Sequence, residues 1–165
     1  MKLRKRSLFS LTILALLIIG VFGFSNPAGL IIEADQVKFT PKYLDMANTP
    51  YLDVTVKLTD ADNNTLVEEI DPTSVTMEGM ITPIVTSVEY SKKGKPIAFH
   101  AEFASSAVNG MLWYILGHTG ITMPVPEAPI QLRLTISGKL IDGSTLWKGS
   151  AIAHVVNWAQ FFPPD

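Results

Sequence analysis

The feature that most restricts the fold of this chain is a strict alternation of apolar and polar side chains. From Leu52 to Leu58 every second residue is apolar, and the same pattern runs from Ile130 to Ile136. A third segment, Ile97–Phe103, repeats it with His100 and Glu102 at its polar positions. A period of two is typical of a β-strand that buries one face, so these segments predict sheets with one wet side.

Further short strands are expected between turn signals along the rest of the chain. Asp142-Gly143 is the strongest hairpin signal, because a Gly at this position accepts the positive φ of a tight turn. Seven or eight strands with turns every ~8–12 residues predict an all-β, antiparallel sandwich rather than a parallel sheet. The other predicted strands are Val37–Thr40, Val75–Glu78, Ile84–Tyr90, Thr145–Lys148 and Ala151–Val156.

One short helix is predicted after the third alternating segment. Ser105 or Ser106 is a suitable N-cap, and Gly117 is a suitable stop. Gly110 weakens this helix by about 1 kcal/mol. The apolar residues at helical spacing are Val108, Met111, Leu112 and Ile115.

The chain begins with a basic segment, Met1–Arg6, followed by the apolar segment Leu8–Phe24. This order predicts an N-terminal apolar helix that directs export, over residues 1–25. Cleavage after Ser25 would make it a signal peptide, whereas its 17 apolar-segment residues also reach the lower limit of a membrane anchor. Both readings place the following residues outside the cytoplasm. Residues 26–36 are predicted to be a linker, 37–158 the sandwich domain and 159–165 a C-terminal tail.

Composition excludes several classes of function. The chain has no cysteine, so disulfides, thiol catalysis and cysteine-bound metal centres are absent. Four of its 13 basic residues lie in Met1–Arg6, which leaves nine against 15 acidic residues. A domain with this negative balance is not expected to bind nucleic acid, which normally requires a basic face.

Two phrases resemble a known family. Ile70–Gly79, IDPTSVTMEG, is similar to a recurring DIDPSTV-x-L-x-G phrase, and Leu134–Ser150 is similar to L-T-V-x-G-x-L-x-D-G-T-x-F-x-G-x-D, with Ser150 at its last position. Both occur in small immunoglobulin-like modules of prokaryotic secreted and cell-surface proteins. The resemblance covers most of residues 37–156. It implies an immunoglobulin-like sandwich with an accessory or spacer role and no catalysis.

The polar turn after Leu58 carries two candidate sites. Asp60, Asp62 and Asn64 place oxygen atoms at alternating positions, as calcium ligands often lie. However, Thr65 and Asp71 stand where the EF-hand loop requires Gly and Glu. Asn63-Asn64-Thr65 is also a glycosylation sequon, with Asn63 as the acceptor. A solvated hairpin turn is the alternative to both.

The aromatic residues near the C-terminus form a candidate interface. Trp158, Phe161 and Phe162 lie among prolines and would be a docking site for a partner if they were exposed. The three histidines, His100, His118 and His154, form no local metal motif, although His154 could lie on a strand next to His100.

The chain lacks a G-x-S-x-G elbow, and no enzyme activity or cofactor is expected. The leading hypothesis is therefore a non-enzymatic exported or membrane-tethered module with a structural, adhesive or accessory role. Its partner would be an envelope or extracellular protein, and Leu8–Phe24 would hold it in the membrane if uncleaved. A module that binds glycan or calcium is the second hypothesis, and a small hydrolase is the third.

Overall fold

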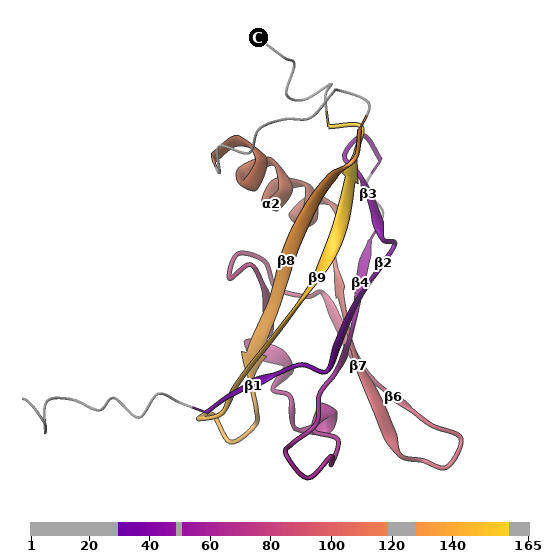
Figure 1. The fold of residues 1–165 in the computed structure, drawn as a ribbon, viewed down its shortest axis with the longest axis vertical. Helices are drawn as coiled ribbons and strands as arrows, with labels where there is room; N and C mark the ends of the chain where they lie inside the picture. The colour runs from indigo at the N-terminus through magenta and orange to yellow at the C-terminus, as the bar shows by residue number, and fades with distance from the viewer. Residues whose placement is uncertain (1–29, 49–50, 119–127, 159–165) are drawn as a thin grey trace, which may run out of the picture.

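A computed structural model describes residues 30–48, 51–118 and 128–158 of the chain. Two β-sheets face each other and α2 packs beside one end of them (Figure 1). The first, here the β8–β9 sheet, has the order β1-β9-β8-β5, and β3 also pairs with β9. Its strands are β1 (Ile31–Glu33), β3 (Tyr43–Asp45), β5 (Thr76–Met77), β8 (Ile130–Lys139) and β9 (Leu146–Val156).

The second sheet, here the β4–β7 sheet, has the order β2-β4-β7-β6 and is antiparallel throughout. Its strands are β2 (Gln36–Thr40), β4 (Leu52–Lys57), β6 (Val85–Tyr90) and β7 (Pro96–Phe103). Two short 3-10 helices, η1 (Val67–Glu69) and η2 (Pro72–Ser74), lie between β4 and β5. The prediction of an all-β sandwich is confirmed at this level, with nine strands in the described residues.

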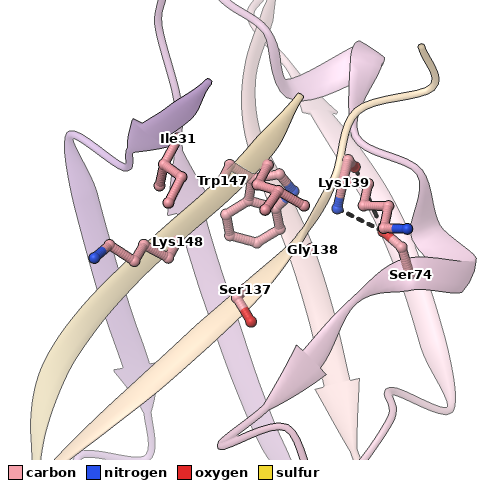
Figure 2. Close-up of a pocket in the computed structure, with 8 residues that line it drawn as sticks. Ile31, Ser74, Ser137, Gly138, Lys139, Trp147 and Lys148 are labelled. Carbon is pink, nitrogen blue, oxygen red and sulfur yellow. Dashed lines mark hydrogen bonds between the residues drawn. The ribbon is translucent and has the colours of Figure 1, made fainter. Parts of the chain in front are cut away.

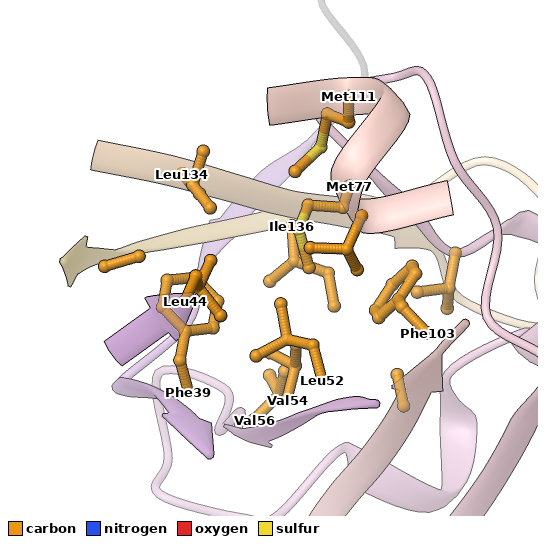
Figure 3. Packing of buried hydrophobic residues seen from close by; sticks show 14 of the residues in the cluster. Phe39, Leu44, Leu52, Val54, Val56, Met77, Phe103, Met111, Leu134 and Ile136 are labelled. Carbon is orange, nitrogen blue, oxygen red and sulfur yellow. The ribbon is translucent and has the colours of Figure 1, made fainter. Parts of the chain in front are cut away.

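The alternating segments place their apolar side chains between the sheets. Leu52, Val54 and Val56 of β4 have no exposed surface. Leu134 and Ile136 of β8 approach them from the other sheet (Figure 3). A core residue in such a cluster loses about 1.5–3 kcal/mol of hydrophobic stabilisation if it is left in water. The period of two therefore results from burial of one face of each strand.

The predicted helix is α2 (Ser105–His118), and it contributes Val108, Met111, Leu112 and Leu116 to the core. It passes through Gly110 and ends one residue after Gly117. At 14 residues it is longer than predicted, because packing of its buried side against the sheets offsets the weak propensity of Gly110.

The Asp142-Gly143 hairpin is confirmed. Gly143 has a φ of +71°. β8 and β9 pair without interruption, from Ile130 opposite Val155 to Lys139 opposite Leu146. The prediction of two closing strands, Thr145–Lys148 and Ala151–Val156, is wrong because a single strand covers both. Gly149, at the predicted break, stays in the ladder opposite Ile136.

Two strands were not predicted, and both run parallel to β9, so the sandwich is not wholly antiparallel. β1 pairs with the start of β9, and β3 pairs with its end. Between them the chain crosses to the other sheet as β2. β1 also lies within residues 26–36, so the linker prediction is wrong for this strand. Three-residue strands are too short to display a period of two, which explains why the pattern missed them.

No helix in the described ranges is long and apolar enough to cross a bilayer. The predictions for residues 1–25, including the apolar helix Leu8–Phe24 and cleavage after Ser25, fall outside those ranges. The same is true of the tail, residues 159–165.

Candidate functional site

Among the described residues, a group of three ionisable side chains lies on the outer face of the β4–β7 sheet. His100 of β7 reaches Asp53 of β4 through Nδ1 and Glu89 of β6 through Nε2, each at 3.2 Å. The residues directly opposite His100 are Thr55 and Ser87, so the imidazole bonds to diagonal neighbours on both sides. This ion-pair cluster connects three adjacent strands.

Two opposing effects set the charge of His100. Partial burial lowers the pKa of the imidazole, but hydrogen bonds to Glu89 and Asp53, together with their negative charges, outweigh it. The pKa of His100 is therefore raised, which favours the imidazolium with an N–H donor on each ring nitrogen.

The same geometry restricts the chemistry that this cluster can perform. A general base must offer a free ring nitrogen to the hydroxyl that it activates. Both nitrogens of His100 hold carboxylates, so Ser87 on the next strand finds no acceptor on the ring. The arrangement links strands electrostatically, as cross-strand pairs commonly do.

A second feature is a pocket of about 270 Å³ at the end of the molecule where β1 and the β8–β9 hairpin lie (Figure 2). Trp147 lies against it almost completely buried, and its indole Nε1 has no hydrogen-bond partner in the described structure. A Cβ on Gly138 would come within 3.0 Å of this nitrogen. The residues that line the pocket are Ile31, Ser74, Ser137, Gly138, Lys139, Leu146, Trp147 and Lys148.

Exposed aliphatic side chains lie at this end of the sandwich, where the described chain begins, and we refer to Leu30, Ile31, Ile141 and Leu146 as the near-end patch. Of these, Ile31 and Leu146 line the pocket. Leu30 and Ile141 are 67% and 69% exposed, and Ile31 is 51% exposed. Three of these residues are neighbours, because Ile31 lies directly opposite Leu146, whose N–H donates to the carbonyl of Leu30. Ile141 lies in the turn between β8 and β9. Apolar exposure of this kind commonly marks an interaction surface.

In the turn predicted to bind calcium, the carboxylate of Asp60 accepts hydrogen bonds from groups of the turn itself. Asp60 Oδ1 accepts hydrogen bonds from the N–H groups of Asp62 and Asn64, and Oδ2 accepts one from the Asn64 amide. The Asn64 side-chain bond is the main reason that the pKa of Asp60 is lowered. Across the residues that the structure describes, no group of three or more His, Cys, Asp or Glu side chains could hold a metal ion.

The sequon acceptor Asn63 lies at the exposed tip of the same turn with a φ of +63°. Its position leaves the side chain accessible to solvent, as a glycosylated asparagine requires.

Trp158 is not the exposed docking residue that the sequence suggested. Its side chain is 2% exposed, and Nε1 donates to the carbonyl of Ala128 at 2.8 Å. A tryptophan at a chain end can close the core when its N–H finds an acceptor, and the carbonyl of Ala128 is that acceptor. Phe161 and Phe162 lie outside the described residues.

The sequence did not reveal the partners of His100, because Asp53 is 47 residues away and only the register of β4 against β7 brings them together. The polar positions of the two alternating segments were the available signal. The expectation that His154 could neighbour His100 is wrong. His154 lies in the other sheet, where its ring packs on Tyr43 with centroids 5.1 Å apart.

Comparisons with known proteins leave the family open: no family model, curated protein or solved structure matches the chain.

Proposed function

We propose that this protein is a non-enzymatic immunoglobulin-like module, exported and held at the cell envelope by its N-terminal segment. Its role is that of a spacer and accessory domain that presents the end farther from the membrane to another envelope or extracellular protein. The basic and apolar residues 1–25 support export, and the two sheets support the domain type.

The strand order supports the immunoglobulin-like assignment. In constant-type immunoglobulin domains, strands A-B-E-D form one sheet and strands C, F and G form the other. Lettering the strands from β2 and omitting β3 gives A-B-E-D for β2-β4-β7-β6, and G-F-C for β9-β8-β5. β1 and β3 are then additional short strands beside the last strand.

The observation that carries the spacer role is the position of the two ends of the domain. Leu30 bonds to Leu146 at the start of β9, whereas Trp158 follows its other end. Ten residue steps along β9 span about 33 Å. The chain therefore enters at one end of the long axis and leaves at the other (Figure 1). A tethered domain with this path projects its far end away from the membrane.

The far end presents aromatic side chains. Trp113 and Tyr114 of α2 are 52% and 53% exposed, and α2 lies beside the end of β8 that pairs with Val155 (Figure 1). Tryptophan and tyrosine are enriched among the residues that dominate binding energy at protein interfaces. We therefore place the partner contact on α2.

Photo-crosslinking of the full chain in its native cells tests this role. A photoreactive phenylalanine analogue replaces Tyr114 at the far end or, as the matched control, Lys93 in the exposed β6–β7 turn. We expect the far-end probe to capture one envelope protein that the control does not capture. Equal capture at both positions would refute the spacer arrangement. Protection of both probes from an added protease in intact cells, with digestion after lysis, would refute export.

A further inference from the structure

We propose that the near-end patch, with Lys139 and Lys148, docks on the surface of an anionic phospholipid bilayer. This inference deepens the proposed function, because it depends on an uncleaved N-terminal anchor. It assigns the end of the sandwich nearest that anchor to the lipid surface and leaves the far end for a protein partner.

The outer face of the β8–β9 sheet carries the required chemistry in two adjacent rows. Ile31, Leu146 and Lys139 occupy the first row across β1, β9 and β8. Glu33, Lys148 and Ser137 occupy the second. Aliphatic side chains flanked by lysines are the usual composition of surfaces that rest in the headgroup region of a membrane.

The pocket beside Trp147 adds an apolar recess to this surface. Its volume of about 270 Å³ lies between Ile31 and Leu146 on one side and Gly138 on the other. Lys139 and Lys148 stand at its border (Figure 2). An acyl segment can enter such a recess while the lysines meet the lipid phosphate.

The length of the connecting chain limits how far this surface can move from the membrane. Six residue steps separate Phe24, the last residue of the apolar segment, from Leu30. Even fully extended, they span at most about 21 Å. The near-end patch is therefore held at high local concentration next to the bilayer, so weak contacts suffice for docking.

Two of the acidic groups near the patch, Glu33 and Asp142, are engaged within the protein. Glu33 pairs with Lys148 at 3.1 Å. Asp142, in the adjacent hairpin turn, accepts hydrogen bonds from the N–H groups of Ser144 and Thr145. Lys139 is the one cation of the first row, and it interacts electrostatically with the carboxylate of Asp71. One lysine near an anionic surface changes partitioning by about fivefold.

Because the chain has no cysteine, a single introduced thiol can report which end meets the lipid. The experiment uses the full chain in vesicles of phosphatidylcholine and phosphatidylglycerol, with a fluorescent label on Ile141→Cys or, as the control, Tyr114→Cys. Flotation reports anchoring. Quenching by a nitroxide on the lipid headgroup, compared with quenching by aqueous iodide, reports docking.

We expect the chain to float with the vesicles and the label at position 141 to be quenched by the lipid nitroxide and protected from iodide. The label at 114 should show the reverse. Lys139→Gln, at an exposed position that tolerates the change, should lower the ratio of docked to undocked chains about fivefold.

Each of the other outcomes overturns a specific part of the proposal, either docking on the lipid or tethering by the N-terminal segment. Flotation with equal iodide access at both labels would overturn docking and leave the tether standing. Protection of position 141 from both quenchers would overturn docking and assign the patch to a contact between copies of this chain instead. Failure to float would overturn the tether, and docking with it.

Discussion

Gly149→Ala should destabilise the domain by about 1–3 kcal/mol, because the added methyl group enters a contact that is already closed. Its Cβ would lie 2.6 Å from Val37 Cγ2 and 2.7 Å from Ala34 Cβ. Ordinary contacts between carbon atoms begin near 3.5 Å, so about 0.9 Å must be gained at Val37 and about 0.8 Å at Ala34. Neither atom belongs to a flexible side chain, since valine is stiff at χ1.

The backbone around this contact restricts relaxation. Ala34 donates its N–H to the carbonyl of Lys148 at 2.8 Å, and Asp35 donates to the carbonyl of Lys57 at 2.9 Å. These bonds hold the corner at which the chain leaves β1 for β2 and changes sheets. Relief of the clash at Gly149 therefore requires movement of β9 against this corner, with loss of hydrogen-bond geometry.

Urea unfolding of the full chain in a mild detergent, followed by tryptophan fluorescence, measures the effect. The matched control is Gly110→Ala in α2, where no atom other than the nearby backbone of the helix itself lies within 4 Å of the new Cβ. This change should raise the free energy of unfolding by about 1 kcal/mol through helix propensity. Combining Gly149→Ala with Ala34→Gly should recover at least about 0.5 kcal/mol. A Gly149→Ala variant as stable as the parent would refute the close packing of β9 on the sheet-switching corner.

Three further measurements test other contacts. The charged His100 stabilises the folded state fully below its unfolded pKa of about 6.5, and this stabilisation disappears as pH rises through its raised pKa in the folded state. His100→Gln should remove it, so the free energies of unfolding of the variant and the parent should converge at alkaline pH. Trp158→Phe should cost about 1–3 kcal/mol through the lost hydrogen bond and a smaller ring, whereas exposed Trp113→Phe should stay within about 0.5 kcal/mol, both read by urea unfolding. Asp142 should titrate near its lowered pKa of about 2 in carboxyl NMR spectra, mainly because the side chain of Thr145 donates a hydrogen bond to it. Thr145→Val should move this pKa back towards 3.8. The stabilisation that the Asp142 carboxylate contributes is present above pH 3.8 and is lost as pH falls towards 2.

The parts of the fold that could be predicted are those in which one segment carries its own signal. β4 and β8 each bury one complete face, so their alternation is visible within a single window. The turn at Asp142-Gly143 needs a positive φ that its own residues supply. β1 and β3 carry no such signal, because their position depends on the edge of β9 and not on their own residues.

The candidate sites depended even more on tertiary structure. His100 reads as an isolated surface histidine until the registers of β4 and β6 bring Asp53 and Glu89 to its ring. Trp158 reads as an exposed aromatic until the carbonyl of Ala128 accepts its N–H and the core covers its ring. For His100, the period of two predicts which face of the strand the residue occupies, but it holds no information on which strands lie beside it. Trp158 follows the end of β9, where no strand period applies.

The two surfaces that the proposals use differ in the kind of apolar side chain that they expose, and this difference connects the two proposals. The near-end patch exposes aliphatic side chains beside lysines, whereas α2 exposes Trp113 and Tyr114. Aliphatic groups lose water favourably to any apolar phase, including lipid, without directional demands. Aromatic rings with polar atoms add geometric selectivity and suit a specific protein surface. A domain about 33 Å long along β9 with such ends fits a role between a membrane and a partner, each contacted by the chemistry that suits it.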